Sequence, residues 1–174
     1  MNYDEALLTY IEVSVALAGF SALVTAIRDR GVETNPHLWV RLRSMIEVAL
    51  LVAAFSAGAL SIRAFGVADE TAWRICSGLL SVAWAAEFLC VMTRAQRLHR
   101  AGFPFGSKPY RYFLYSIAVL SAASLATNAF GWWSSSAGAV YFTNLGLLLL
   151  VAGVWFIRLV AGVVPDAPPS NGAA

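Results

Sequence analysis

The stretch "YIEVSVALAGFSALVTAI", Tyr10 to Ile27, decides the fold class. Glu12 is its one charged residue, and an apolar run of this length predicts a helix that crosses a membrane. Similar runs recur along the chain, in which 59% of the residues are hydrophobic and 13% are charged, with a mean hydropathy of +0.68. An ordinary soluble domain has about 25% charged residues. The chain is therefore predicted to be an all-α, integral membrane helical bundle.

Five spans are predicted, each long enough to cross about 30 Å of hydrocarbon at about 1.5 Å per residue. Their approximate bounds are 6–27, 40–62, 72–92, 112–130 and 139–159. The fourth is the least apolar, so a four-span alternative with this segment lying at the interface stays open. Residues 1–164 form one transmembrane domain in this interpretation, and the proline-rich residues 165–174 form a disordered cytoplasmic tail.

The basic residues predict the orientation of the spans. Of the twelve Lys and Arg residues, Arg63 and Arg74 fall on one predicted side and the other ten on the opposite side. Because basic loops stay in the cytoplasm, we expect the N-terminus outside, the C-terminus inside, and a multi-pass protein of the bacterial inner membrane. Aromatic residues at the span ends fit an interfacial belt; they are Trp39, Trp73, Trp132, Trp133 and Tyr141.

Three carboxylates lie inside predicted spans: Glu12, Glu47 and Glu87. At about 1.5 Å per residue, Glu12 lies about 9 Å below the outer edge, and the other two lie about 8 to 11 Å above the inner edge. A charge at such depth costs a few kcal/mol, so each carboxylate is expected to face protein or water and to have a partner.

The structural interpretation of these carboxylates is ion pairing. Arg43 lies one helical turn from Glu47, and Arg63 or Arg74 could reach Glu12 from the outer side. For Glu87, the best candidates are Arg41 or Arg43 on the neighbouring span. The functional interpretation is that Glu12, Glu47 and Glu87 line a path for protons or small cations, with Glu12 mattering least for flux.

Small and polar residues predict how the helices meet. Spans one, two and three each carry small residues at every fourth position, and the first of these stripes is Ser14, Ala18, Ala22 and Ala26. Such faces pack within one chain or against a second copy. Asn128 and Asn144 are expected to form polar contacts between spans four and five, or to line an outer vestibule.

No catalytic, metal or nucleotide motif is present in the sequence. His37 and His99 fall outside the spans, and the serines of the spans have no base at matching depth, so no enzyme, cofactor or metal site is expected. Topology alone accounts for the basic residues, which argues against nucleic-acid binding. Between spans three and four, contact with anionic lipid is expected at Arg94, Arg97, Arg100, Lys108 and Arg111.

The stretches "IEVSVALAGFSALVTAIR" and "LRSMIEVALLVAAFSAGAL" resemble the first two spans of small, uncharacterised bacterial inner-membrane proteins. The shared features are Ala18, Gly19 and Phe20 in the first span, and Arg41, Leu42, Arg43 and Glu47 at the start of the second. This resemblance covers about a third of the chain and implies a membrane class and compartment, but no activity.

Two functions fit these observations. The first is a homo-oligomer that permits ion or proton permeation through its bundle. The alternative is a non-catalytic accessory or scaffolding subunit of a larger membrane complex. Water-accessible carboxylates along one cavity favour permeation, whereas carboxylates closed off in salt bridges favour the accessory role.

Overall fold

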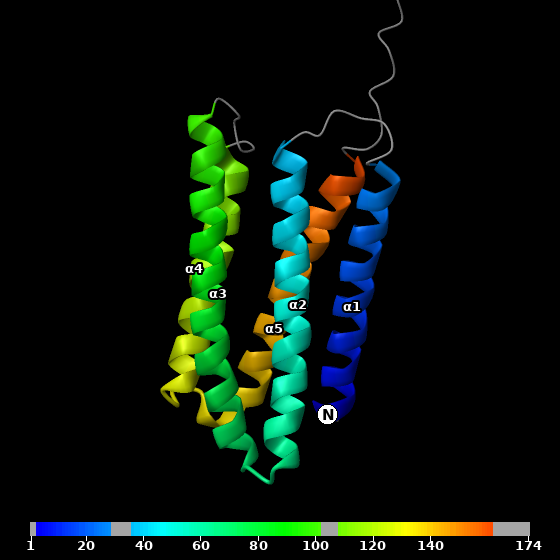
Figure 1. The fold of residues 1–174 in the computed structure, drawn as a ribbon. Helices are drawn as coiled ribbons and strands as arrows, with labels where there is room; N and C mark the ends of the chain where they lie inside the picture. Colours follow the sequence, from blue (N-terminus) through cyan, green and yellow to red (C-terminus); the bar gives the residue numbers. More distant parts are fainter. Residues whose placement is uncertain (1–2, 29–35, 102–107, 162–174) are drawn as a thin grey trace, which may run out of the picture.

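The computed structural model describes residues 3–28, 36–101 and 108–161, and these form an up-and-down bundle of helices (Figure 1). The elements are α1 (Tyr3–Arg28), α2 (Pro36–Ala64), α3 (Asp69–Arg100), α4 (Lys108–Ala129), the short 3-10 helix η1 (Ser134–Ser136) and α5 (Ala137–Ala161). All five α-helices are long and apolar enough to cross a membrane. The prediction of an all-α, five-helix membrane bundle is confirmed, and the protein is a multi-pass membrane protein. The predicted tail, residues 165–174, lies outside the described residues.

The fourth helix does have the length of a span, over Tyr112–Ala129. Three of its polar residues turn toward neighbouring helices, because Ser121 and Asn128 are buried and Ser124 is half-buried. Its low hydropathy therefore reflects polar contacts inside the bundle. The five-span interpretation holds over the four-span alternative.

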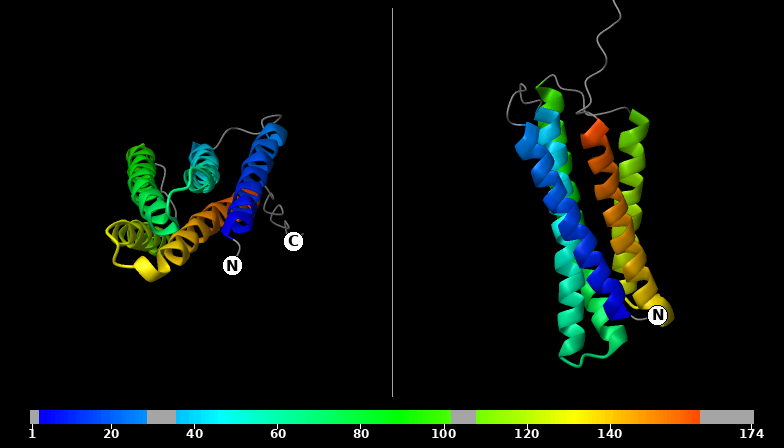
Figure 2. Two further views of the ribbon diagram at one scale, coloured as in Figure 1. Left: turned by 90° about the horizontal axis from the view of Figure 1, so that it is seen from below. Right: turned by 90° about the vertical axis from the view of Figure 1, so that its right-hand side faces the viewer.

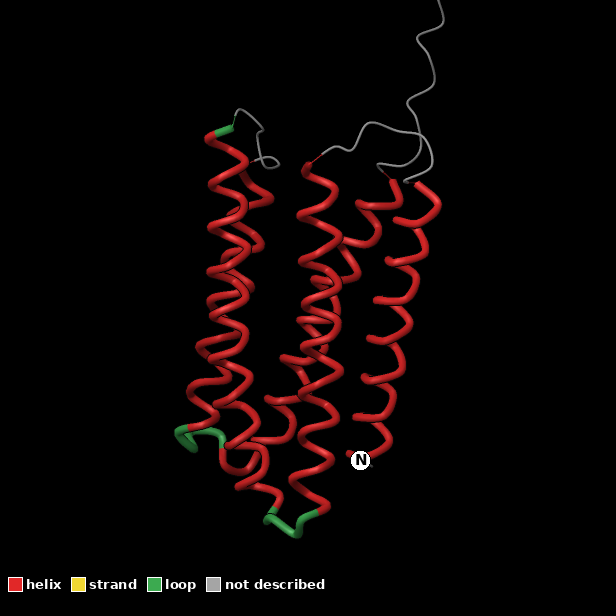
Figure 3. Tube along the Cα trace, in the orientation of Figure 1, coloured by secondary structure: helices red, strands yellow, loops and turns green. Residues whose placement is uncertain are grey.

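The odd-numbered and even-numbered helices run in opposite directions, so the bundle has two ends (Figure 1). We call one the Tyr3 end, where α1 begins and α2 turns into α3, and the other the Arg94 end, where α3 finishes and α4 begins. Tight turns close the Tyr3 end (Figure 3). The side of the membrane on which each end lies stays a prediction.

The helices α2 and α5 occupy the centre of the arrangement, with α3 and α4 on one side and α1 on the other (Figure 2). Within the described residues, α1 packs mainly against α2 and to a lesser extent against α5. It is thus an edge helix, and one long face of it points away from the bundle.

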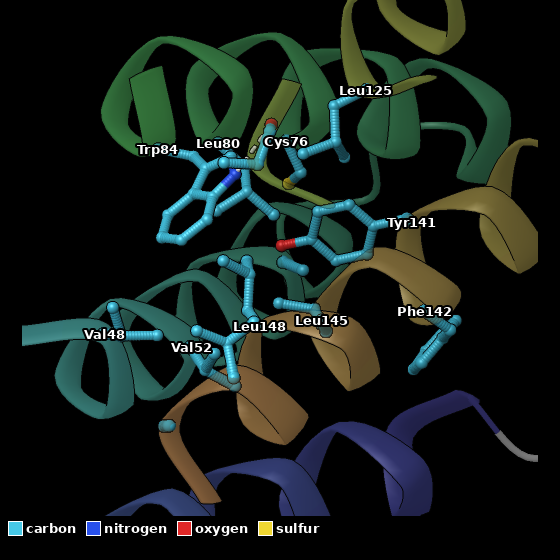
Figure 4. Close-up of a cluster of buried hydrophobic side chains, with 14 of the residues drawn as sticks. Val48, Val52, Cys76, Leu80, Trp84, Leu125, Tyr141, Phe142, Leu145 and Leu148 are labelled. Atoms are coloured by element: carbon cyan, nitrogen blue, oxygen red, sulfur yellow. Dashed lines mark hydrogen bonds between the residues drawn. The ribbon is translucent and has the colours of Figure 1, made fainter. Parts of the chain in front are cut away.

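The middle of the bundle is filled by apolar side chains from all five helices. Figure 4 shows Tyr141 at the centre, near Leu80 and Cys76 of α3 and Leu145 of α5. The Tyr141 hydroxyl donates a hydrogen bond to the Phe55 carbonyl of α2 at 2.8 Å. Buried apolar packing therefore separates the polar groups of the Tyr3 end from those of the Arg94 end.

Two residues of the predicted aromatic belt belong to this core. Tyr141 is 0% exposed and Trp73 is 3% exposed, whereas Trp132 and Trp133 are 79% and 49% exposed. Trp73 packs edge-on against Tyr3 and Phe142 instead of facing lipid. The belt prediction is therefore wrong for Trp73 and Tyr141, because both lie on helix faces that turn inward. The side chain of Trp39 lies outside the described residues.

Candidate functional site

A cluster of charged residues lies at the Arg94 end, between α2 and α3. The Glu47 carboxylate accepts hydrogen bonds from Arg94 Nη1 at 2.5 Å and Nη2 at 3.2 Å, and from Arg43 Nε at 2.7 Å. The contact predicted between Arg43 and Glu47, one turn apart, is present. The contact with Arg94 was not anticipated, and it ties α2 to α3 across 47 sequence positions.

Glu87 adds a second carboxyl to this cluster. Its side chain lies close to Glu47, near the charges of Arg94 and Arg43. The Glu87 Oε1 atom is buried and accepts no hydrogen bond from the described residues. Glu87 therefore joins Glu47 rather than pairing separately with Arg43, and the side chain of Arg41 lies outside the described residues.

An open cavity of about 670 Å³ borders the cluster. Its polar lining consists of Glu47 and three arginines, and its apolar lining comes from one stretch of α2; the residues are Val40, Leu42, Arg43, Ile46, Glu47, Arg94 and Arg97. The sequence interpretation placed Arg94 and Arg97 in a loop, but α3 continues through both of them to Arg100. The cavity therefore has helical walls on both sides.

Glu12 lies in a different environment, on the outward face of α1. Its side chain is exposed, and it makes no hydrogen bond or ion pair with the described residues. It lies nine residues beyond Tyr3, about 14 Å along the helix axis. The three carboxylates consequently do not line one cavity: two are clustered at the Arg94 end, and Glu12 faces away from the bundle.

A regular row of exposed residues runs along α1 through Glu12. We call Thr9, Glu12, Ala16, Gly19 and Leu23 the α1 seam; they alternate at intervals of three and four, and all are exposed. Buried residues on the opposite side of the same helix repeat every seven positions, at Leu7, Ser14 and Ser21. The α1 seam is thus the centre of the face that the subunit leaves uncovered.

The arginines predicted to reach Glu12 have other partners. Arg63 pairs with Asp4 of α1 and, at 2.9 Å, with Asp69 of α3. Its guanidinium carbon also lies 5.2 Å from the centroid of the Trp73 ring. The predicted approach of Arg63 to Glu12 is therefore wrong, since nearer acids engage this arginine at the Tyr3 end.

Arg74 is likewise engaged elsewhere, because it pairs with Glu70 one turn away on α3, at 2.6 Å. It lies against Gly131 at the end of α4, where an added Cβ would come within 2.6 Å of Arg74 Nη2. The prediction that Arg74 approaches Glu12 is wrong for the same reason, which leaves Glu12 without a cation from the described residues.

Asn128 and Asn144, the two amides predicted to form contacts between helices, each bond to a neighbouring helix, but they do not bond to each other. Asn144 Oδ1 of α5 accepts hydrogen bonds from Ser121 at 2.7 Å and Ser124 at 3.0 Å, both on α4. Asn128 Nδ2 of α4 donates to Ser77 of α3 at 2.8 Å and to the Ala137 carbonyl of α5 at 2.9 Å. Sequence reasoning missed the serine partners because spacing along one chain does not show which helices are neighbours.

A cavity of about 440 Å³ opens beside Asn144, Ser121 and Thr143, on the groove between α4 and α5. Ser121 and Ser124 already donate their hydroxyl groups to the Asn144 side chain, so this cavity has few polar groups left to bind a ligand. Within the described residues, no group of three His, Cys, Asp or Glu side chains is placed to hold a metal ion.

Comparisons of the chain with models of protein families, with curated proteins and with solved structures found no match. The function proposed below therefore rests on the geometry of Glu12, the α1 seam and the charged cluster.

Proposed function

We propose that this protein is a non-catalytic subunit that assembles with copies of itself in the bacterial inner membrane through the α1 seam. The observation that carries the proposal is the exposed position of Glu12 on the outward face of an edge helix. A carboxylate facing hydrocarbon costs a few kcal/mol, and burial against a protein partner reduces that cost.

The α1 seam has the features of a helix–helix contact in a membrane. Small residues let two backbones approach, and a Cβ added at Gly19 would meet nothing within 4 Å in the subunit. Alternation at intervals of three and four positions is the spacing by which two parallel helices interlock. The same row on a second copy matches it, since each seam presents Ala16 and Gly19 at its middle.

The polar part of the seam also suits a second copy. In a parallel pair, Glu12 of one copy lies beside Glu12 and Thr9 of the other, where a protonated carboxyl can donate a hydrogen bond to a neighbouring carboxyl. The carboxyl groups would then satisfy each other away from lipid. A homo-oligomer thus needs no cation from another protein to cover Glu12.

The test is subunit counting in lipid bilayers for the wild type, Gly19→Leu and Gly58→Leu. Both glycines are helical, and a Cβ at either would meet nothing within 4 Å, so neither substitution creates a clash at Cβ inside the subunit. We expect an oligomer for the wild type and for Gly58→Leu, and mostly monomers for Gly19→Leu. A monomeric wild type, or equal assembly of both variants, would contradict the proposal.

Permeation of protons or cations is the second candidate, and the position of Glu12 supports it as well. Assembly through the α1 seam would gather one Glu12 from each copy at an interface, where carboxylates can attract cations. Within one subunit, by contrast, buried apolar residues fill the space between the two ends. A path along the interface is therefore favoured over a path through the subunit.

Liposome flux measurements test permeation separately from assembly. We expect wild-type liposomes to pass protons or a small cation, and Glu12→Gln to reduce this flux while keeping the oligomer. This replaces the expectation from the sequence that Glu12 matters least, because the exposed position of Glu12 brings it to the proposed interface. The matched control is Glu5→Gln, an exposed acid at the start of the same helix. If liposomes with the wild-type protein are no leakier than empty ones across several ions and voltages, permeation is rejected and only the proposed assembly is left.

A further inference from the structure

The cavity at the Arg94 end is lined by arginine donors that make no hydrogen bond with the described residues. Arg94 directs both terminal nitrogens to Glu47, while Arg43 contacts Glu47 through Nε alone. The terminal nitrogens of Arg43 and the whole guanidinium of Arg97 make no hydrogen bond or ion pair with the described residues. Both arginines line the cavity, so at least two sets of donors are available to a ligand there.

The charge of the lining favours an anion. Three arginines and one carboxylate face the cavity, which gives a formal charge of +2. Glu47 is already held by Arg43 and Arg94, so its charge is largely matched, and Arg97 contributes a charge that pairs with no acid among the described residues. The cavity therefore repels cations and attracts anions of roughly the size of its 670 Å³ volume or smaller.

The shape of the donors points to a tetrahedral oxyanion. Guanidinium groups bind phosphate through pairs of parallel hydrogen bonds, which makes arginine clusters suitable phosphate sites. The other wall of the cavity is apolar and belongs to the end of a membrane-spanning helix, at Val40, Leu42 and Ile46. A cationic rim beside an apolar wall matches a molecule that has a phosphate group and a hydrocarbon part.

From this arrangement we propose that the cavity between α2 and α3 binds a phosphate group, held by Arg43 and Arg97, with Glu47 keeping Arg94 in place. The phosphate belongs either to the headgroup of an anionic lipid or to a free phosphate anion. The proposal does not depend on assembly through the α1 seam, since Arg43 and Arg97 lie on other helices.

The test uses the full chain in neutral detergent, with native mass spectrometry of added phosphatidylglycerol and calorimetry of inorganic phosphate. The variants are Arg97→Gln, which loses a cavity donor, and Arg100→Gln, its control. Both residues are exposed and lie one turn apart near the end of α3, but Arg100 does not line the cavity. A third variant, Glu47→Gln, removes the negative charge from the lining.

We expect phosphatidylglycerol to bind the wild type at one site per chain. Its affinity for Arg97→Gln should be about 10-fold lower, and its affinity for Arg100→Gln should stay within about 2-fold of wild type. Glu47→Gln is expected to bind more tightly, because it removes the repulsion and frees donors of Arg94. A purely structural role for the arginines would not produce tighter binding in that variant.

The two sources of phosphate are distinguished by the second ligand. If inorganic phosphate binds by itself, and binds more weakly to Arg97→Gln, the result supports a free anion as the ligand. If only the lipid binds, the result supports a lipid headgroup. The proposal is overturned if neither ligand binds better than phosphatidylcholine does, or if Arg97→Gln and Arg100→Gln behave alike.

Discussion

Arg63 joins three helices at the Tyr3 end. From α2 it reaches Asp4 on α1 and Asp69 on α3, and its guanidinium lies over the rings of Tyr3 and Trp73. Its side chain is 19% exposed, while the two acids are more than half exposed. A mostly buried arginine with two acidic partners and two aromatic contacts contributes more to stability than a solvated surface ion pair does.

Replacing Arg63 by Gln is therefore expected to destabilise the fold by about 2 kcal/mol, since it leaves two acids unpaired and removes a cation from two aromatic rings. The measurement is the free energy of unfolding in detergent, with Arg74→Gln as the control. The Arg74–Glu70 pair is local and exposed, so its loss should cost about 0.5 kcal/mol. Equal losses for the two variants would show that the contacts across helices add nothing.

For individual residues, the sequence predicted contacts within a helix better than contacts between helices. The pair Arg43–Glu47 follows from a spacing of four on one helix. The bonds of Glu47 with Arg94, and of Arg63 with Asp4, depend on which helices are neighbours and how they are rotated. Spacing along the chain contains neither piece of information, so Glu12 was assigned partners that bind elsewhere.

Among elements, the stripes of small residues show why the packing faces were only partly predictable. Residues four apart are separated by about 400° around a helix, so a row at every fourth position drifts by about 40° per step. In α1 the predicted stripe accordingly begins at the buried Ser14 and reaches the exposed Ala26. The exposed row that alternates three and four, the α1 seam, stays on one face.

The end of α3 was misplaced for a related reason. Hydropathy falls after Met92, where the basic residues begin, but the sequence "TRAQRLHR" contains good helix formers and no glycine or proline. The helix therefore continues to Arg100. Hydropathy detects the membrane boundary, whereas helix propensity determines how far beyond that boundary the helix continues.

The end of α4 depends on one glycine. Gly131 has a φ of +83°, its amide donates to the Asn128 carbonyl at 3.0 Å, and the Trp132 amide donates to the Thr127 carbonyl at 3.2 Å. These bonds form a Schellman motif, in which glycine avoids the cost of a left-handed conformation. The motif sets the position of η1 and of the first turn of α5.

Gly131→Ala should lower the free energy of unfolding by about 1 to 2 kcal/mol through this backbone cost. A smaller addition arises because the new Cβ would displace the Arg74 guanidinium. Gly66→Ala is the control for the contact with Arg74: its φ of +77° gives a similar backbone cost, but a Cβ there meets nothing within 4 Å, so it should lose slightly less stability. Thermal melting of both variants is the measurement, and a Gly131→Ala protein as stable as wild type would refute the role given to this turn.

For the whole molecule, the sequence predicted the class and the number of spanning helices because apolar length alone decides both. Our prediction of the orientation uses a separate signal, the concentration of basic residues at the Arg94 end. We expect a reporter fused after Ala174 to be cytoplasmic and a reporter inserted at Ser134–Ser136 to be periplasmic. The reverse result at both sites would contradict this orientation, and the same side for both would mean that α5 does not cross the membrane.

The proposed assembly also concerns the whole molecule, and we expect it at the exposed face of α1. Cysteine scanning of positions 12 to 23 in α1 would test the contact directly. The scan uses a chain with Cys90→Ser, because Cys90 is exposed while Cys76 is buried. Each variant is oxidised in native membranes, and the fraction of cross-linked dimer is measured.

We expect maxima of cross-linking at positions 12, 16, 19 and 23, and low values at Val15 and Phe20, which are exposed but lie to either side of the α1 seam. Exposure alone would make all six positions react alike. Cross-linking that is absent along α1, or that is highest at Val15 or Phe20, would contradict the claim that copies of this protein meet through the α1 seam.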